Sequence, residues 1–180
     1  MKAPEAVHTS RLLLRRPVAA DAEAIFRRYA ADPAVTRYLS WPTHRSMADT
    51  RAFLAWADDE WDRWPAGPYL VFARGQGSGA LLGGTGLAFK TPVRAVTGYV
   101  FAQDAWEQGF ATEALTAVVE LARQVGVQRL EAVCHVDHQA SAHVLQKCGF
   151  QQEDARREHF TFPNLTPQKR SEVFSYALIL

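Results

Sequence analysis

The segment from Trp106 to Ala114 has the residue types and spacing of an anion-binding turn. It follows a predicted strand and begins an amphipathic helix, and the small residues Gly109 and Ala111 let the backbone approach a ligand closely. The first N–H groups of a helix have no partner within the helix and carry a partial positive charge, which suits a phosphate or pyrophosphate. On Gly109 alone, the alternative is an ordinary turn between a loop and a helix.

Two cysteines and a histidine in the last third of the chain have side chains that could act as a nucleophile or a base. Cys134 alternates with apolar residues along a predicted strand, and Cys148 lies on the apolar side of a short helix. We expect both to be small core residues, with a catalytic thiol as the alternative. His135 faces away from Cys134 on the same strand, and an ordinary pKa of about 6.5 suits a general base. The alternative is a structural histidine.

Hydrophobic periodicity predicts the elements that must position these residues. Residues 96–101 form a strand, a helix runs from Gly109 to Gly126, residues 129–136 form a second strand, and residues 140–148 form a short helix. A strand, a helix and a second strand in this order make a parallel pair. Because the rest of the chain indicates antiparallel strands, we expect a mixed α/β sheet with helices on both faces.

The first half and the end of the chain are predicted to extend this sheet. The expected order is a loose lead-in (1–8), a strand (12–15), a helix after Asp21, a second helix (47–64), a hairpin (69–74 and 81–89) around a glycine-rich turn, a variable loop (90–95) and late strands near 157–162 and 173–180. Ser46 and Asp49 resemble a capping box for the second helix. Its expected buried face holds Phe53, Trp56, Ala57, Trp61 and Trp64.

Length and composition predict one cytoplasmic domain over residues 1–180. The chain is 48% hydrophobic and 22% charged, and its formal net charge of +1 gives no reason to expect a nucleic-acid partner. Two cysteines fit a reduced compartment. Neither an export signal nor a membrane-spanning run is visible, so we expect no membrane association.

Several motifs in a fixed order resemble the GNAT superfamily of N-acetyltransferases, and within it the branch of the ribosomal-protein N-terminal (Rim-type) enzymes. The resemblance extends over residues 9–178 and is carried by residues 9–15, 32–35, 98–101, 106–114 and 141–150. It implies a mainly antiparallel sheet of six to seven strands, splayed at a central parallel pair. It also implies an acetyltransferase that takes acetyl-coenzyme A (acetyl-CoA) as co-substrate and uses no metal.

The resemblance also implies where the co-substrate binds. The pyrophosphate is expected on the N–H groups of Gln108, Gly109, Phe110, Ala111 and Thr112, and the pantetheine arm along the strand edge at Tyr99, Val100 and Phe101. Further contacts are expected from His138, Ser141 and Lys147. Relatives commonly have Gly where this chain has Glu107, and Asn where it has His138, and both departures affect the detailed geometry.

For the chemistry, the resemblance implies an N–H near Val100 or Phe101 that stabilises the oxyanion and a hydroxyl, Ser141, that meets the leaving thiolate. Ser141 as a simple helix cap is the alternative. Many relatives carry Glu at the position of Val96, so the base is left open between His135, His138 and water relays to solvent.

The acceptor site is expected near Tyr38 and Trp41, where the family builds the wall of its acceptor pocket. The predicted function is transfer of an acetyl group to a primary amine by direct attack in a ternary complex. The amine could belong to a protein N-terminus, a polyamine, a metabolite or an antibiotic. The alternative is a non-catalytic acyl-CoA-binding or sensor domain, and edge strands leave room for a homodimer.

Overall fold

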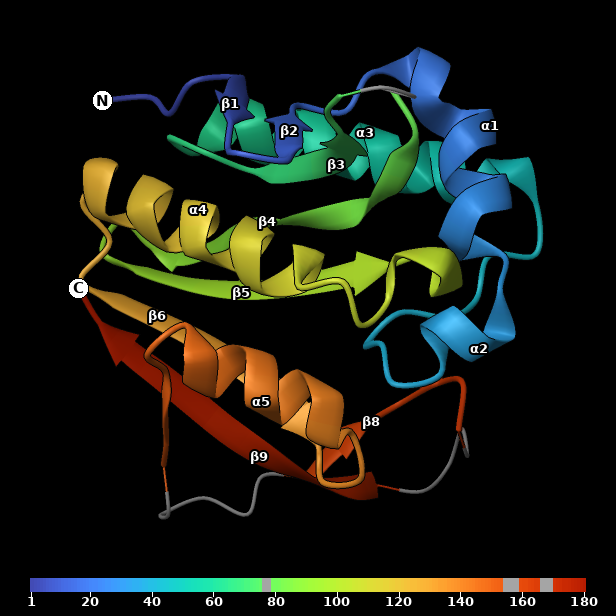
Figure 1. Cartoon of the computed structure of the whole chain (residues 1–180). Helices are drawn as coiled ribbons and strands as arrows, with labels where there is room; N and C mark the ends of the chain where they lie inside the picture. Colours follow the sequence, from blue (N-terminus) through green and yellow to red (C-terminus); the bar gives the residue numbers. More distant parts are fainter. Residues whose placement is uncertain (76–78, 154–158, 166–169) are drawn as a thin grey trace.

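The strands of the computed structural model form one mixed sheet. The described residues are 1–75, 79–153, 159–165 and 170–180. The strands are β1 (Ala6–His8), β2 (Leu12–Arg15), β3 (Pro68–Ala73), β4 (Leu81–Thr91), β5 (Arg94–Phe101), β6 (Arg129–His135), β7 (Gln151–Gln152), β8 (His159–Thr161) and β9 (Arg170–Ile179). Across these residues the order is β1-β2-β3-β4-β5-β6-β9-β7, and β8 pairs with the beginning of β9. Neighbours are antiparallel except β5 and β6, which run parallel (Figure 1).

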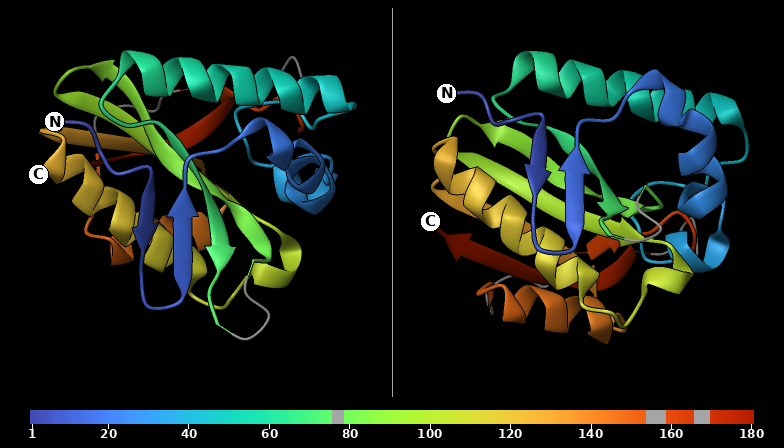
Figure 2. Two further views of the ribbon diagram at one scale, coloured as in Figure 1. Left: turned by 90° about the horizontal axis from the view of Figure 1, so that it is seen from above. Right: turned by 45° about the horizontal axis from the view of Figure 1, so that its top comes forward.

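Helices cover both faces of this sheet. They are α1 (Ala22–Ile25), continued by a π-helical turn (Phe26–Ala30), α2 (Pro33–Thr36), α3 (Met47–Arg63), α4 (Phe110–Gln124) and α5 (Gln139–Lys147), with short 3-10 turns at Ala19–Asp21 and Gln103–Ala105. Helices α4 and α5 lie on one face, and α1 and α3 lie on the other (Figures 1 and 2). The predicted mixed sheet with helices on both faces is therefore confirmed. The predicted number of six to seven strands was wrong, because the short strands β1 and β7 add to the sheet and bring it to nine strands among the described residues.

The long helix α3 begins as its sequence predicts but buries a different stripe. Asp49 accepts a hydrogen bond from the Ser46 N–H at 3.0 Å, which completes the predicted capping box. The buried residues are Thr50, Leu54, Ala57, Glu60 and Trp61, which recur at the helical spacing. The prediction that Trp56 is buried was wrong, because that position is turned off this stripe and its side chain is 44% exposed.

Two further sequence predictions need correction. Residues 6–8 are not a loose lead-in, because β1 pairs with β2 through Ala6↔Arg15 and His8↔Leu13. Residues 90–95 are not a variable loop, because β4 and β5 extend toward each other until Thr91 faces Arg94 across a two-residue turn. The β1 pairing matters for the site, because it fixes the turn at residues 9–11 beside α4.

The main core lies between the sheet and α4. Leu115, Val118 and Ala122 face inward from α4 and pack with Leu130 of β6 and with the strands around it. A smaller cluster packs beneath α1 around Ile25, Leu70 and Leu81. Since α4 is anchored along its length, the position of its first turn is fixed relative to β5.

At Gly83 the backbones of β4 and β5 come too close for any side chain. A Cβ there would lie 2.0 Å from the Val100 carbonyl oxygen and 2.9 Å from the Phe101 Cα, both of them backbone atoms. Gly83→Ala should therefore lower the free energy of unfolding by about 3 kcal/mol or more, as overpacking against backbone does. Urea unfolding measures this, with Gly98→Ala as the matched control, since a Cβ at Gly98 meets nothing within 4 Å. Equal stability of the two variants would contradict the described packing of β4 on β5.

Candidate active site

The turn that begins α4 has the backbone conformation of an anion cradle. Gly109 precedes the helix with φ +77°, and Glu107 has φ +59°, so both adopt the left-handed region. A glycine adopts this region without strain, whereas a residue with a Cβ is disfavoured there by roughly 1–2 kcal/mol. The N–H groups of residues 110–112 form the first turn of α4, where the helix offers them no carbonyl. They converge at the positive end of a 15-residue helix.

A carboxylate behind this cradle ties it to the turn between β1 and β2. Glu113 Oε1 accepts hydrogen bonds from the Thr9 hydroxyl at 2.6 Å, the Ser10 hydroxyl at 3.0 Å and the Arg11 N–H at 2.9 Å, and Oε2 accepts one from Arg11 Nε at 2.7 Å. Burial alone would raise the pKa of Glu113, but these hydrogen bonds outweigh it and lower the pKa to about 2. The carboxylate therefore stays charged and holds the two segments together.

Two more side chains hold the cradle from either side. Arg11 donates to the Gln108 carbonyl at 2.9 Å, and its guanidinium lies over the Phe110 ring at 4.6 Å. On the other side, the Trp106 indole N–H donates to the Phe101 carbonyl at 2.7 Å. The cradle is thus linked to β2 and to the end of β5, so its N–H groups are oriented before any ligand binds.

Next to the cradle, β5 and β6 part. Their parallel pairing includes only Arg94–Val96 with Arg129–Glu131, and the later residues of β5 pair with β4 alone. A cavity of about 1070 Å³ enters this gap, bordered by Val96, Gly98 and Val100 of β5 and by Ala132 and Cys134 of β6. The gap thus exposes one edge of β5, which an extended ligand can pair with.

A hydroxyl pair spans the gap between β5 and the beginning of α5. The Tyr99 Oη lies 2.9 Å from the Ser141 Oγ and donates to the Ser141 carbonyl oxygen at 3.1 Å. Burial raises the pKa of Tyr99, so its hydroxyl keeps its proton at neutral pH. Both residues line the cavity. The contribution of the Tyr99 side chain was missed by the sequence analysis, which used only its backbone.

The two histidines occupy different environments around Tyr38. His138 lines the cavity and stacks on the Tyr38 ring at 4.8 Å, and burial, followed by the nearby His135, lowers its pKa, so it is neutral at pH 7. The His135 ring packs against two aromatic rings, with centroid distances of 5.0 Å to Tyr38 and 5.1 Å to Phe162. His135 does not belong to the described cavity lining, because its strand turns the ring under Tyr38.

Other predicted residues are distributed along the same region. Cys134 is a core residue and burial raises the pKa of its thiol to about 11, as expected for a structural cysteine. Lys147 is exposed in the last turn of α5, at the opposite end of that helix from Ser141. The Gln108 side chain donates to the Asp104 carbonyl at 2.6 Å, so its amide is already engaged within the turn before α4.

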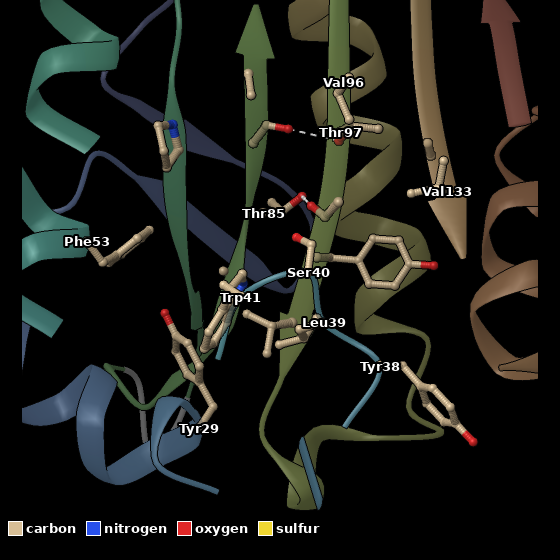
Figure 3. A pocket seen from close by; sticks show the side chains of 18 of the residues that line it. Tyr29, Tyr38, Leu39, Ser40, Trp41, Phe53, Thr85, Val96, Thr97 and Val133 are labelled. Atoms are coloured by element: carbon tan, nitrogen blue, oxygen red, sulfur yellow. Dashed lines mark hydrogen bonds between the residues drawn. The ribbon is translucent and has the colours of Figure 1, made fainter. Parts of the chain in front are cut away.

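Aromatic side chains from three segments surround one half of the cavity. Tyr38 and Trp41 come from the loop after α2, Phe53 and Trp56 from α3, and Phe160 from β8. Figure 3 shows Trp41, Phe53 and Tyr29 grouped on one side, with Val133 of β6 across the cavity. The two predicted acceptor residues, Tyr38 and Trp41, are therefore brought to the same cavity as Ser141.

One amide joins the outer segments of this half. Asn164 Oδ1 accepts from the Thr43 N–H at 2.8 Å and from its hydroxyl at 3.1 Å, while Nδ2 donates to the carbonyls of Thr36 at 2.7 Å and Trp41 at 2.9 Å. All four of these hydrogen bonds hold the loop after α2 against the segment after β8. No local pattern could predict this contact, because its partners are more than 120 residues apart in the chain.

Comparison with known proteins identifies the family. Residues 11–151 match the acetyltransferase (GNAT) domain. This chain belongs to the GNAT acetyltransferases. It is 33% identical over 171 residues to the uncharacterized N-acetyltransferase YoaA of Bacillus subtilis, covering 89% of this chain and 90% of that protein.

Solved structures with the same GNAT fold include two that are related to ribosomal-protein acetyltransferases. RimL, a ribosomal L7/L12 α-N-protein acetyltransferase in complex with coenzyme A, aligns with a TM-score of 0.82 at 23% identity and 98% of each chain. A structure described as a ribosomal-protein-serine acetyltransferase from Vibrio cholerae aligns with a TM-score of 0.79 at 23% identity and 100% of each chain. At these identities the likeness shows the GNAT fold.

The departures of this GNAT chain from its family pattern have physical consequences. Glu107 adopts the left-handed backbone that the family's usual Gly adopts freely, and its side chain is exposed. Val96 borders the cavity where many relatives have a carboxylate.

Among the described helices, none is long and apolar enough to cross a bilayer.

The Glu113 contacts predict how stability depends on pH. A carboxylate with a pKa of about 2 in the folded chain, against 4.5 ordinarily, stabilises the fold above about pH 4.5 and loses this contribution as the pH falls toward 2. Glu113→Gln should therefore be less stable than the wild type at pH 7, and the difference should shrink as the solution is acidified. Urea unfolding between pH 7 and 3 measures this. Glu120→Gln on the exposed side of α4 is the control, and parallel curves for wild type and Glu113→Gln would contradict the assignment.

Proposed function

We propose that this GNAT acetyltransferase moves an acetyl group from acetyl-CoA to a primary amine by direct attack in a ternary complex. The observation that carries the proposal is the unpartnered first turn of α4, which offers N–H groups to an anion and lies beside the gap between β5 and β6. Pyrophosphate would bind the N–H groups of Gln108 to Thr112, and the pantetheine arm would pair with β5 at Tyr99 to Phe101. The complexes of RimL with coenzyme A and of the microcin immunity acetyltransferase MccE with acetyl-CoA support acetyl-CoA as the co-substrate.

The remaining cofactor contacts follow from the same placement. Ser141 and His138 lie at the beginning of α5 on the cavity, near the thioester end of such a ligand. Lys147 is an exposed cation on the same helix and would meet the distal phosphate. A neutral His138 can donate one hydrogen bond, as the Asn of relatives does.

In the transfer step the amine nitrogen attacks the thioester carbonyl, the C–N bond forms and the C–S bond breaks. An N–H near Val100 or Phe101 stabilises the oxyanion, and Ser141 hydrogen-bonds the leaving sulfur. The proton lost by the amine passes to His138 or to water. These two remain as candidate bases, because Val96 offers no proton acceptor and His135 lies outside the described lining of the cavity, whereas His138 belongs to it.

A non-catalytic acyl-CoA-binding domain is the second candidate, and the apolar Val96 beside the gap is the observation that favours it. A thiol-release assay with acetyl-CoA and a panel of primary amines separates the two. Amine-dependent release of coenzyme A supports the transferase. Tight binding of acetyl-CoA with no release for any amine would favour the sensor.

The cradle predicts that a single substitution abolishes binding of the co-substrate. Gly109→Asp places a side chain and a negative charge among N–H groups that are expected to hold a pyrophosphate, so affinity for acetyl-CoA should fall by at least about 100-fold. Isothermal titration calorimetry measures it. Gly126→Asp is the matched control, because Gly126 has φ +87° at the other end of α4. Equal affinities for the two variants would place the pyrophosphate elsewhere.

The hydroxyl pair predicts a coupled effect on turnover. Ser141→Ala should lower kcat by about ten-fold with little change in affinity for acetyl-CoA, because the lost contact strengthens in the transition state. Tyr99→Phe should lower kcat by about five-fold when Ser141 is present and have no further effect in Ser141→Ala. Steady-state kinetics of the two single variants and the double variant measure this. Fully additive losses would show that Tyr99 does not act through Ser141.

A further inference from the structure

Aromatic rings line much of the half of the cavity that holds Trp41 and Phe53, which we call the acceptor half. Its described lining includes the rings of Tyr29, Trp41, Phe53, Trp56 and Phe160. Trp56 lines this space although its side chain is 44% exposed, so a large apolar surface is left facing solvent at the mouth. A cavity lined largely by aromatic rings suits an apolar group.

Formal charges are confined to the mouth. Among the described residues that line the cavity, the charged side chains are Arg45 and Asp49, both of them exposed at the beginning of α3. Asp49 Oδ2 already accepts from the N–H groups of Arg45 at 2.8 Å and Ser46 at 3.0 Å and from the Ser46 hydroxyl at 3.3 Å. This oxygen therefore caps the N-terminus of α3. His44 adds no charge, since burial lowers its pKa.

Two glycines leave part of the floor of this half open. A Cβ on Gly98 would meet no atom within 4 Å, and one on Gly84 would lie 3.4 Å from the Tyr29 hydroxyl oxygen. Figure 3 shows this hydroxyl pointing toward the space between Phe53 and Trp41. A flat group can therefore lie on the backbone of β4 and β5 between aromatic walls, with one hydroxyl to meet a polar atom.

These features decide between the acceptor classes that the sequence leaves open. A polyamine or another polycation would bring several ammonium groups into a space whose described lining holds one carboxylate, that of Asp49 at the mouth. The cost of desolvating an unpaired ammonium exceeds the attraction of an aromatic face for it. A monoamine leaves no such charge behind, because its one nitrogen loses its proton in the reaction. Its apolar body gains from burial against the rings.

We propose that the acceptor is a monoamine on a flat aromatic body and that polycationic amines are poor acceptors, an inference that rests on the proposed transferase function. Such an amine could be a small molecule or the first residue of a peptide. Trp56 and Phe53 would contact the aromatic body, and Tyr29 would meet a polar substituent on it.

The test compares 2-phenylethylamine, a tripeptide amide with N-terminal phenylalanine, and spermidine, at saturating acetyl-CoA. The expected result is a kcat/KM for at least one aromatic amine that exceeds that for spermidine by 30-fold or more. Trp56→Ala should lower this aromatic kcat/KM by about ten-fold, whereas Trp56→Phe should keep most of it because an aromatic face remains. Ala52→Glu adds a carboxylate at the mouth and should raise kcat/KM for spermidine.

Calorimetry of the same amines with the coenzyme A complex gives a readout that does not depend on turnover. Tighter binding of the aromatic amines than of spermidine supports the inference. Equal or better binding or turnover of spermidine, or an unchanged aromatic kcat/KM in Trp56→Ala, would overturn it. Absence of thiol release for every amine, with aromatic binding retained, would instead contradict the proposed transfer.

Discussion

The parting of β5 from β6 after three paired residues is the constraint on which the site depends. Pairing ends at Val96 and Glu131, so the later N–H and carbonyl groups on that edge of β5 have no strand to bond. Buried backbone groups need partners, and a ligand or water must supply them here. The same gap admits the cavity, places Tyr99 opposite Ser141, and brings the end of β5 to the beginning of α4. A fully paired sheet would close all of these.

Distant segments keep this open region in shape. Glu113 and Arg11 hold the cradle against the turn between β1 and β2, and Asn164 holds the loop after α2 against the segment after β8. Both anchors are hydrogen-bonded groups that join parts of the chain separated by about 100 residues or more. The turn before α4 and the loop after α2 are thus held by two separate sets of hydrogen bonds.

Local patterns were sufficient to predict most of the elements and the cradle. The capping box at Ser46, the period of α4 and the alternation along β6 are properties of neighbouring residues, and the structure agrees with each. Tertiary contacts decided the rest. Trp56 has the residue type of a core position, but the direction of α3 turns its side chain toward the cavity. His135 is buried and packs against the Tyr38 ring.

The side-chain roles had even less local signal. Neither Glu113 nor Tyr99 has a neighbour in sequence that reveals its partner, since their contacts with Thr9 and Ser141 come from the pairing of β1 with β2 and from the gap between β5 and β6.

A crystal structure with coenzyme A tests the central claim most directly. The account predicts pyrophosphate oxygens within hydrogen-bonding distance of the N–H groups of residues 110–112 and a pantetheine arm between β5 and β6. A coenzyme bound away from α4, with that gap empty, would contradict it.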